Sequence, residues 1–542
     1  MTINPSFLAS KLTKKPIIWS ISGADCSGGA GIAADIKTGH SLKVEVCHLI
    51  TANTVQNSKR VSSINPIEVK ILAEQAQALR IDKPPAVIKI GLIANGEQIN
   101  WLVALLLSLK AQLPDLLVVY DPVGQASVGG FLTTLSTGAL KSLLPLVDVI
   151  TPNIIEAKQL NTLHETSPNN NVLNMAKNIL KLGCNAVIIK GGHASDKIPS
   201  NAKTYCTDIC LQNLASTLST TKATTQLITL QSPKLNTSYS HGGGCSFASA
   251  LASFLAHGYL LRDAFTLTKA YINQGLSLTT EIATEISSDT TNVNITDKSE
   301  INPYYGAFEQ GMWPSKPTDF PKIISPITQQ LQSLPCFQSL NLSNKEKLGL
   351  YPVIDSLTWL ERLLPLNLNI IQLRIKNNDI KVVEPLIEKA VTMARDYKCR
   401  LFINDHWQLA IKYGAYGVHI GQEDLNGADL DAIAKAGLRL GISTHGCYEF
   451  LLAKQLQPSY LAIGAIFPTK TKNMTGQIQG LSNLTQILAL ADTVPVVAIG
   501  GINQQRLAQV WSTGVSAVAV VTAITEARHP VIAAQAMQAQ LI

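Results

Sequence analysis

The sequence predicts two α/β domains in series, an α/β sandwich followed by a (β/α)8 barrel. The chain has 542 residues, which exceeds what one hydrophobic core usually serves. In the second half, short apolar runs rich in β-branched residues are each followed by a helical pattern, which is typical of a (β/α) barrel. In the first half, apolar runs alternate with helical patterns in the same way, which indicates a mostly parallel sheet flanked by helices.

The composition fits buried parallel sheets and gives no sign of a membrane segment. The chain is 46% hydrophobic and only 15% charged, as expected when strands are buried on both faces. Its longest apolar run, residues 101–109, is about half of the ~20 residues that a membrane span needs. The apolar run behind the basic N-terminus is too short for a signal peptide. We therefore expect a cytoplasmic protein with no membrane partner.

Cysteine usage and net charge argue against zinc, disulfides and nucleic acid. The nine cysteines are an odd number without a CxxC pair, so neither a disulfide framework nor a zinc site is predicted. The net charge of +7 has no basic block behind it. This charge suits small anionic substrates and is weak support for a nucleic-acid partner. A homo-oligomer is left open.

Six strands are predicted in the first half, at residues 17–23, 44–50, 87–90, 117–120, 147–150 and 186–189. Ligands of parallel sheets collect at the carboxyl ends of the strands. Polar residues stand just past these ends: Gln56, Lys89, Asp121, Asn153, Glu156 and Lys190. We expect them to line a ligand site, although solvated loop positions can supply several such residues.

Two glycine-rich turns precede helices in this half. The first, with Gly28, Gly29 and Gly31, lacks the spacing of a dinucleotide fingerprint or a P-loop and is also compatible with a simple tight turn. The second spans residues 242–244, whose N–H groups would form an anion hole for a transferring phosphoryl group. Cys245 follows at a helix N-terminus, where a thiol pKa is lowered, so it can act as a base or donate to the transition state. The alternative is a turn with a buried cysteine.

Seven motifs follow one another in the first half: GADCSGGAGIAADIKT, ITANTVQNS, VIKIG, DPV, TPNIIEA, IKGGH and HGGGCSFASA. Over about residues 16–275 they closely resemble hydroxymethylpyrimidine/phosphomethylpyrimidine kinases of the ribokinase-like superfamily. The resemblance implies ATP-dependent phosphorylation of 4-amino-5-hydroxymethyl-2-methylpyrimidine and then of its monophosphate. It implies pyrimidine contacts for Asp35 and Gln56, Mg-ATP positioning by Asn153 and Glu156, nucleotide-phosphate contact by Lys190, and catalysis by Cys245 with Gly242 and Gly244.

Two departures from the kinase pattern matter. Residues 124–127 read Gly-Gln-Ala-Ser where the family usually has a Met-Val-Ala-Thr-like segment, and Gly243 replaces the usual threonine of the anion loop. The missing hydroxyl would weaken phosphate contact by about 0.5–1.5 kcal/mol and slow the kinase without abolishing it. A non-catalytic, pyrimidine-binding regulatory half on an active synthase is therefore the alternative.

The connection between the halves has two parts. Residues 279–302 are rich in Thr, Ser, Asn and acidic residues, which indicates a linker. Residues 303–335 carry Tyr304, Tyr305, Phe308, Trp313 and Phe320, and aromatics at this density should be buried. We predict an aromatic strap lying across one or both domains. The predicted boundaries are 1–278 for the first domain, 279–344 for the linker and strap, and 345–542 for the barrel.

Eight barrel strands are predicted, at residues 348–354, 369–373, 400–403, 417–420, 438–442, 460–464, 494–499 and 517–521. The loops after strands 7 and 8 of such barrels commonly bind phosphate, and here they carry Gly500, Gly501 and Thr522. Candidate side chains follow the other strands: Gln372, Arg374, Lys376, Asn404, Asp405, Gln422, Glu423, Asp424, Ser443, Thr444, His445, Thr469, Thr471 and Lys472.

The candidate loops combine carboxylates with cations and hydroxyls. Two carboxylates from neighbouring loops suit Mg²⁺ bridging to a diphosphate, and lysines and hydroxyls would stabilise departing pyrophosphate. Any one of these residues can instead form a surface salt bridge, but the whole set at strand ends of one polarity favours a site. His419 and His445 are interpreted as orienting or core residues, because zinc-ligand patterns are absent.

The stretches GLYPVID, IIQLRIKN, INDH, GVHIGQEDL, GISTH, IGAIFPTKTK, QGL, AIGGI and VVTAI resemble thiamine phosphate synthase across residues 345–542. The resemblance implies joining hydroxymethylpyrimidine diphosphate to 4-methyl-5-(2-phosphoethyl)thiazole, giving thiamine phosphate and pyrophosphate. It implies the following roles: pyrimidine diphosphate held by Gln372, Arg374, Lys376 and Asn404, Mg²⁺ bound by Asp405 and Asp424, phosphates contacted by Thr469, Thr471 and Lys472, thiazole phosphate held by Gly501 and Thr522, and catalysis by Ser443 and Lys472. Since the kinase product is the synthase substrate, the sequence predicts a bifunctional enzyme of thiamine biosynthesis.

Overall fold

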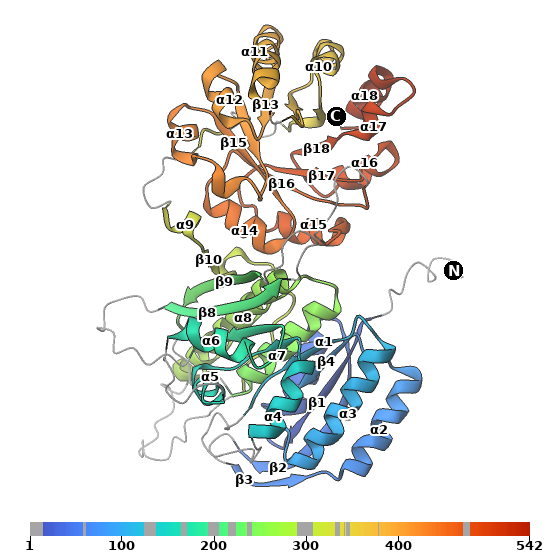
Figure 1. The fold of residues 1–542 in the computed structure, drawn as a ribbon, viewed down its shortest axis with the longest axis vertical. Coiled ribbons are helices and arrows are strands. Elements are labelled where there is room, and N and C mark those ends of the chain that lie inside the picture. Colours follow the sequence, from blue (N-terminus) through green and yellow to red (C-terminus); the bar gives the residue numbers. More distant parts are fainter. Residues whose placement is uncertain are drawn as a thin grey trace. The chain divides into compact units, whose positions relative to one another are not determined.

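The computed structural model describes residues 15–57, 61–123, 137–163, 171–192, 205–214, 224–235, 241–289, 307–330, 337–340, 342, 347–377, 379–469 and 477–541. The chain forms two compact units (Figure 1). The first consists of residues 1–314 with 318–321, and the second of residues 315–317 with 322–542. No helix among the described residues is long and apolar enough to cross a membrane.

The first unit contains a mixed sheet in the order β9-β8-β7-β6-β5-β4-β1-β2-β3. Its parallel strands are β1 (Ile17–Asp25), β2 (Glu45–Gln56), β4 (Val87–Ile90), β5 (Leu117–Tyr120), β6 (Val149–Ile150) and β7 (Ala186–Ile189). Antiparallel strands β3 (Val61–Pro66), β8 (Tyr205–Leu214) and β9 (Thr224–Pro233) extend both ends of this parallel set. The predicted α/β sandwich is confirmed, with β2 running on to Gln56 beyond its predicted end.

Helices cover both faces of this sheet (Figure 1). On one face α2 (Val69–Asp82) packs on α3 (Gly96–Gln112), α3 on α4 (Thr137–Leu143), and α5 (Ile154–Asn161) on α6 (Val172–Leu180). On the other, α1 (Gly31–Ser41) packs on α7 (Gly243–Ala256), and α7 on α8 (Leu261–Asp289). The short turn η2 (Leu144–Leu146) leads into β6. The glycine-rich turns before α1 and α7 therefore lie on the same side of the sheet.

The segment between the predicted domains is divided between the two units. Helix α8 continues to Asp289, past the predicted domain end at 278. Residues 307–314 and 318–321, which include the turn η4 (Pro317–Asp319) in part, belong to the first unit, and Phe308 is buried there. Strand β10 (Lys322–Ile324) and helix α9 (Pro326–Gln330) belong to the second unit. Tyr304 and Tyr305 lie outside the described residues.

The second unit is a closed parallel barrel, and its eight predicted strands are confirmed. The strands are β11 (Gly349–Ile354), β12 (Ile370–Leu373), β13 (Arg400–Asn404), β14 (Gly417–Ile420), β15 (Arg439–Thr444), β16 (Tyr460–Ile463), β17 (Val496–Ile499) and β18 (Ala517–Val520). Strand β18 closes the ring by pairing in parallel with β11. The strands are short and mostly apolar, as expected where a barrel buries both of their faces.

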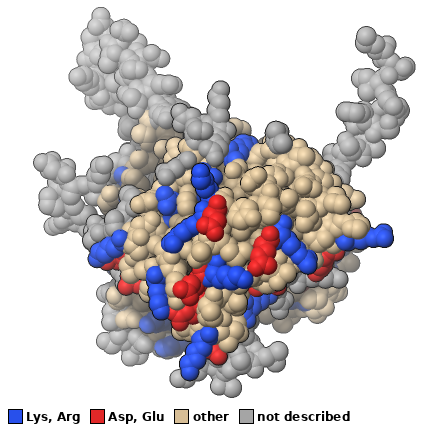
Figure 2. All heavy atoms as spheres, turned by 90° about the horizontal axis from the view of Figure 1, so that it is seen from above, with Lys and Arg blue, Asp and Glu red and all other residues tan. Residues whose placement is uncertain are grey.

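Helical segments follow the barrel strands in turn: α10 (Leu357–Leu363), η6 (Leu364–Leu366), α11 (Ile380–Asp396), α12 (Trp407–Tyr413), η7 (Leu425–Gly427), α13 (Leu430–Lys435), α14 (Cys447–Gln455), α15 (Gly480–Leu488), α16 (Gln504–Trp511), α17 (Thr522–Thr525) and α18 (Pro530–Ala539). Inside the ring, the aromatic rings of Tyr351, Phe402 and Tyr460 are fully buried. Space for Tyr460 depends on Gly441, because a Cβ there would lie 2.2 Å from the tyrosine ring. On the face of the protein drawn in Figure 2, basic and acidic side chains are interspersed without a block of one sign.

Candidate active sites

The first unit has a cavity of about 610 Å³ at the carboxyl ends of its central strands. Both glycine-rich turns line it, so the predicted anion loop and the first turn face one space. Seven of the predicted kinase residues are among its lining: Gln56, Asn153, Glu156, Lys190, Gly242, Gly244 and Cys245. Residues chosen from strand ends and glycine-rich turns therefore share one cavity.

The two glycine-rich turns pack backbone against backbone. Gly242 has a left-handed φ of +84°, and a Cβ at this position would lie 1.8 Å from the carbonyl oxygen of Gly29. A Cβ on Gly29 would in turn lie 2.3 Å from the ring of His241. At Gly243, by contrast, the nearest atom to a built Cβ is 4.0 Å away, so the missing threonine is not excluded by space. The second departure, residues 124–127, lies outside the described residues.

The pKa of the Cys245 thiol is raised, whereas the sequence predicted a lowered one. Removal from water raises the pKa of the partly buried thiol to about 11, and the nearby charge of Lys89 only partly opposes this effect. The position at the start of α7 therefore does not produce a thiolate in the ligand-free site. This raised pKa favours a protonated Cys245, which can donate a hydrogen bond, over the base that the sequence left open.

Asp35 does not line this cavity, so the cavity lining gives no support to its predicted pyrimidine contact, which stays a prediction. Its carboxylate is fully buried, 2.8 Å from Lys89 Nζ, and accepts hydrogen bonds from Ser20 Oγ and Ser249 Oγ at 2.5 and 2.6 Å. Burial lowers the pKa of Lys89, but the neighbouring negative charges, that of Asp35 first among them, together raise it by more, so the net pKa lies above its ordinary value. Asp35 lies beneath the site and joins α1, β4 and α7. Its place in the second turn of α1 turns it towards the protein interior.

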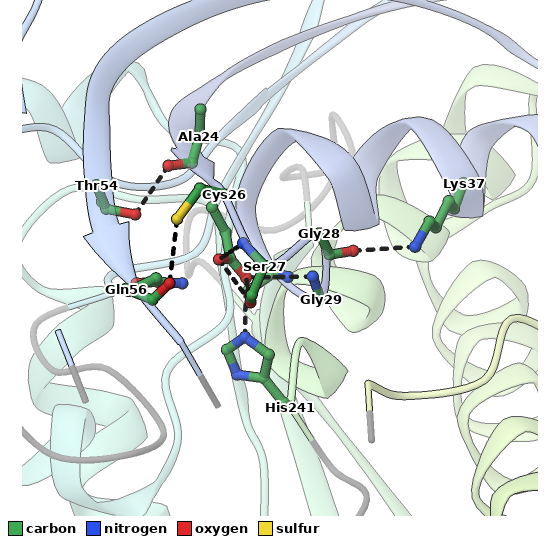
Figure 3. A network of polar contacts seen from close by, with 11 residues as sticks. Ala24, Cys26, Ser27, Gly28, Gly29, Lys37, Thr54, Gln56 and His241 are labelled. Carbon is green, nitrogen blue, oxygen red and sulfur yellow. Dashed lines mark hydrogen bonds and ion pairs between the residues drawn. The ribbon is translucent and has the colours of Figure 1, made fainter. Parts of the chain in front are cut away.

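Asp25, which the sequence reading missed, lies at the carboxyl end of β1 and lines the cavity. Its carboxylate accepts hydrogen bonds from the backbone N–H groups of Ser27, Gly29 and Ala30 at 2.8, 3.2 and 2.9 Å. His241, which immediately precedes the anion loop (Figure 3), places its Nε2 2.9 Å from Asp25 Oδ2, the oxygen that also accepts from Gly29 and Ala30. Asp25 thereby ties both glycine-rich turns together. Its position directly after a predicted strand could have identified it.

The nucleotide-side candidates have structural partners of their own. Asn153 and Glu156 form a reciprocal capping box at the start of α5, with the Asn153 N–H donating to Glu156 Oε2 at 2.7 Å. Burial raises the pKa of Glu156 to about 7, Lys190 lowers it and Asp121 raises it again. Lys190 Nζ donates to Asp121 Oδ1 at 2.8 Å, next to the anion loop. Gln56 stands at the end of β2, where its carbonyl accepts from Cys26 Sγ at 3.1 Å (Figure 3).

The barrel has a cavity of about 970 Å³ at the carboxyl ends of its strands. Ten of the predicted synthase residues line it: Gln372, Arg374, Lys376, Asn404, Asp405, Asp424, Ser443, Thr469, Gly501 and Thr522. These ten residues lie at the ends of seven different strands, β12 to β18. Packing within any one segment does not account for their gathering around one cavity. Thr471 and Lys472 lie outside the described residues.

Asp405 and Asp424 form the acidic part of this cavity. Asp405 has a left-handed φ of +62° and its backbone N–H donates to the carbonyl of His419 at 2.9 Å. Burial and then the charge of Asp424 raise its pKa, as expected for two neighbouring carboxylates. Among the described residues no three His, Cys, Asp or Glu side chains are grouped to hold a metal. Two carboxylates still fit Mg²⁺, which takes its remaining ligands from water and substrate phosphates.

The loops after β17 and β18 form the other end of the cavity. Gly500 and Gly501 have left-handed φ values of +100° and +65°. A Cβ on Gly501 would lie 2.6 Å from the carbonyl oxygens of Phe467 and Pro468, so only glycine fits. Thr522, exposed at the start of α17, brings its hydroxyl to the same end. Glycine backbone that a ligand can approach closely, together with a hydroxyl, suits an anionic group there.

Ser443 lies between these two ends and is held from inside the barrel. Its Oγ is 2.8 Å from His419 Nε2, and its carbonyl accepts from Gln422 Nε2 at 2.8 Å. Burial lowers the pKa of His419 to about 3, with a further contribution from Arg374, so the ring is neutral. His419 Nδ1 is 2.7 Å from the hydroxyl of Tyr460. His419, which the sequence suggested is an orienting or core residue, thus links Ser443 to Tyr460 and also lines the cavity.

Comparison with known proteins matches the two units separately. The phosphomethylpyrimidine kinase family model matches residues 25–289, and the thiamine monophosphate synthase model matches residues 350–524. A thiamine-phosphate synthase of Yersinia pestis (strain Pestoides F) is 56% identical over 183 residues, which are 34% of this chain and 85% of the relative.

Two solved structures resemble the first unit. Phosphomethylpyrimidine kinase from Clostridium difficile 630 is 30% identical, over 48% of this chain and 99% of its own, with a TM-score of 0.37. Pyridoxal kinase from Staphylococcus aureus in complex with AMP-PCP is 27% identical, over 48% of this chain and 88% of its own, with a TM-score of 0.39.

Proposed function

The chain belongs to the thiamine-phosphate synthase family through its barrel and carries a phosphomethylpyrimidine kinase domain ahead of it, and from this premise we propose the order of its chemistry. The kinase phosphorylates the hydroxymethylpyrimidine alcohol and then its monophosphate, with ATP as donor. The barrel joins the resulting diphosphate to the thiazole phosphate. The observation that carries this proposal is the set of ten predicted residues around one barrel cavity.

In the kinase, the chain's own groups mainly position phosphates. The N–H groups of Gly242 and Gly244 and the thiol of Cys245 face the transferring phosphoryl group, where fixed donors stabilise developing negative charge. Lys190 contacts the nucleotide phosphates, Asn153 and Glu156 position Mg-ATP, and Gln56 contacts the pyrimidine. Asp25 holds the first glycine-rich turn against His241, and the pyrimidine contact of Asp35 stays a prediction.

In the synthase, the C–O bond to the diphosphate breaks first, and the aminopyrimidine stabilises the resulting methylene cation. The thiazole nitrogen then supplies its electron pair to form the new C–N bond. Gln372 and Asn404 hold the pyrimidine, while Arg374, Lys376, Ser443 and Thr469 donate to the departing pyrophosphate. Gly501 and Thr522 hold the thiazole phosphate. Thr471 and Lys472 stay predicted phosphate contacts.

Asp405 and Asp424 are the residues that would hold Mg²⁺ in the barrel. Bound there, the ion supplies positive charge to the diphosphate oxygens as the pyrophosphate leaves. Burial and then the charge of Asp424 raise the pKa of Asp405, and a bound cation would offset both effects. A cytoplasmic location and a homo-oligomeric state stay predictions.

A one-pot assay tests the proposed function. The full chain, given the pyrimidine alcohol, ATP, Mg²⁺ and thiazole phosphate, should form thiamine phosphate and pyrophosphate, and omission of ATP should abolish the product. Supplying the pyrimidine diphosphate directly should restore synthesis without ATP. Failure with the supplied diphosphate would contradict the synthase assignment. Pyrimidine binding without ATP turnover would instead support a regulatory first unit.

The pKa of Glu156 predicts a pH dependence of the kinase. Because burial raises this pKa to about 7, the side chain is mostly protonated at pH 6 and mostly ionised at pH 8. Only the ionised form favours Mg-ATP, so the KM for ATP should fall by about tenfold over this range. Glu156→Gln should flatten this dependence in the same buffers, which separates it from titration of ATP. A wild-type KM that does not change with pH would contradict the role of Glu156.

A further inference from the structure

Five side chains form an unbroken hydrogen-bonded chain across the inside of the barrel, which we call the barrel relay. Gln372 Nε2 lies 3.3 Å from Tyr351 OH, which lies 2.7 Å from Tyr460 OH. The Tyr460 hydroxyl is 2.7 Å from His419 Nδ1, and His419 Nε2 is 2.8 Å from Ser443 Oγ. Both ends of the relay, Gln372 and Ser443, line the barrel cavity, and so does His419 next to Ser443. The relay therefore links two separate parts of the substrate site.

Packing fixes the middle of the relay. The ring of Tyr460 stacks on His419 at 5.6 Å and meets Phe402 edge-on at 5.0 Å. Tyr351 packs edge-on against Tyr460 at 6.0 Å. These contacts, and the close fit of Tyr460 against Gly441, fix the positions of the two tyrosine hydroxyl oxygens and of the imidazole ring. Only the directions of the hydroxyl hydrogens and the choice of protonated imidazole nitrogen remain free.

The relay has two self-consistent directions. A neutral imidazole has one donor and one acceptor nitrogen, and each hydroxyl donates once. If Gln372 donates to Tyr351, the direction runs on to His419, whose Nε2–H donates to Ser443. Ser443 then donates its own hydrogen to the cavity, and Gln372 presents its carbonyl oxygen there. In the opposite direction Ser443 donates inward, and Gln372 presents its NH2 group to the cavity.

We propose that Tyr351, Tyr460 and His419 are positioning residues that couple the amide orientation of Gln372 to the hydroxyl direction of Ser443. A substrate with an amine at Gln372 and acceptor oxygens at Ser443 matches one direction of the relay at both ends. An otherwise identical pyrimidine with an oxo group in place of the amine favours the other direction at Gln372, which withdraws the Ser443 donor. The relay thus selects aminopyrimidine diphosphates. This inference rests on the proposed function of the barrel.

The test breaks the relay in the full chain with Tyr460→Phe, which keeps the ring and removes the hydroxyl. Synthase kcat/KM for the amino diphosphate should fall about 10–100-fold, below the loss for a donor that contacts the transition state directly. The ratio of kcat/KM for the amino diphosphate to kcat/KM for the oxo diphosphate should fall. If Tyr460 acts through Ser443, then Tyr460→Phe should cause little further loss in a Ser443→Ala background.

A second break and a matched control keep the result interpretable. Tyr351→Phe interrupts a different link and should reproduce both effects, even if Tyr460→Phe folds poorly. Tyr416→Phe is the control, because the Tyr416 hydroxyl donates to Leu340 O at 3.2 Å and is not part of the relay. The Tyr416 ring also packs against Phe402, with centroids 5.7 Å apart. This substitution should leave the synthase kinetics unchanged. Thermal midpoints and kinase turnover of the same chains report folding and enzyme concentration.

The possible outcomes separate the inference from the function. Wild-type protein that makes no thiamine phosphate from supplied diphosphate would overturn both. An active wild type with unchanged amino-to-oxo preference in Tyr351→Phe and Tyr460→Phe would overturn the relay alone. The relay would also be overturned if Tyr460→Phe lowered kcat/KM by the same factor in the Ser443→Ala background as in the wild type. Such a result would show that Tyr460 acts independently of Ser443.

Discussion

We expect Asp25→Asn to remove most kinase turnover while thiamine phosphate synthesis from supplied diphosphate continues. The Asp25 carboxylate accepts from three backbone N–H groups of the first glycine-rich turn and lies 2.9 Å from His241. An amide offers one acceptor oxygen and would turn its NH2 group towards some of these donors. Several buried donors would lose their partner, and both turns would shift. A displacement of about 1 Å at such a site lowers activity about 100-fold.

The charge of Asp25 also makes the substitution sensitive to pH. Burial alone would raise its pKa, but hydrogen bonds from His241 and then Ser27 lower it well below the ordinary value. A lowered folded-state pKa contributes stability above the unfolded value of about 3.9, and this contribution is lost as pH falls through the folded-state pKa. The thermal midpoints of the wild type and Asp25→Asn should differ most above about pH 5 and converge towards about pH 2.

Asp115→Asn is the matched control, because Asp115 is an exposed carboxylate of the same unit that does not line the cavity. It should leave the kinase kcat/KM and the thermal midpoint unchanged. Synthase turnover measured on the same samples corrects for concentration. Asp25→Asn protein with wild-type kinase kcat/KM would show that the carboxylate does not hold the turns in their active arrangement.

The contrast between Asp25 and Asp35 shows how far sequence reasoning reached at the kinase site. Both aspartates belong to one motif, and the sequence assigned the pyrimidine contact to the one within the helix. The rule that ligands collect past strand ends points instead to Asp25, which ends β1. Asp35 faces Lys89 on β4, a pairing between residues 54 positions apart. Local patterns do not reveal such partners.

The barrel site was more predictable because its topology is regular. Once eight parallel strands are identified, the residues that follow the strands lie on the same rim, which is why Arg374 and Thr522 share a cavity although far apart in sequence. The relay was not predicted, because Tyr351 and Tyr460 read as apolar residues within strands. Only three-dimensional packing brings their hydroxyl groups within 2.7 Å of each other.

The aromatic strap was correctly expected to be buried in the case of Phe308, but sequence could not say against which unit. The burial of Phe308 depends on contacts with residues far away in the sequence, which the local pattern does not reveal. A Cβ on Gly275 would lie 2.2 Å from the Phe308 ring, so this glycine of α8 makes room for the phenylalanine. The Phe308 N–H donates at 2.8 Å to the carbonyl of His241, which directly precedes the anion loop. The strap therefore supports the kinase site from the protein interior.

We expect a fragment of residues 1–278 to lose kinase activity and a fragment of residues 1–321 to keep it. The shorter fragment ends within α8 and lacks the partners of several polar groups on the helices. Gln310 accepts from Thr38 and Tyr271 at 2.9 and 2.7 Å, and donates to Ser246 at 3.0 Å. Met312 N–H donates to Gln274 at 2.9 Å. Losing these partners leaves buried polar groups unsatisfied, at about 1–3 kcal/mol each.

Substitutions in the full chain separate this effect from simple truncation damage. Phe308→Ala removes a buried ring next to the anion loop and should lower kinase kcat/KM at least about tenfold, because a large core truncation costs about 3–5 kcal/mol. Met312→Ala changes a side chain of the same strap that is 76% exposed and should have no effect. An active 1–278 fragment, or a fully active Phe308→Ala protein, would mean that the anion loop holds its shape without the strap. The kinase would then end where the sequence placed it, and residues 307–321 would serve only to cover apolar surface on α7 and α8.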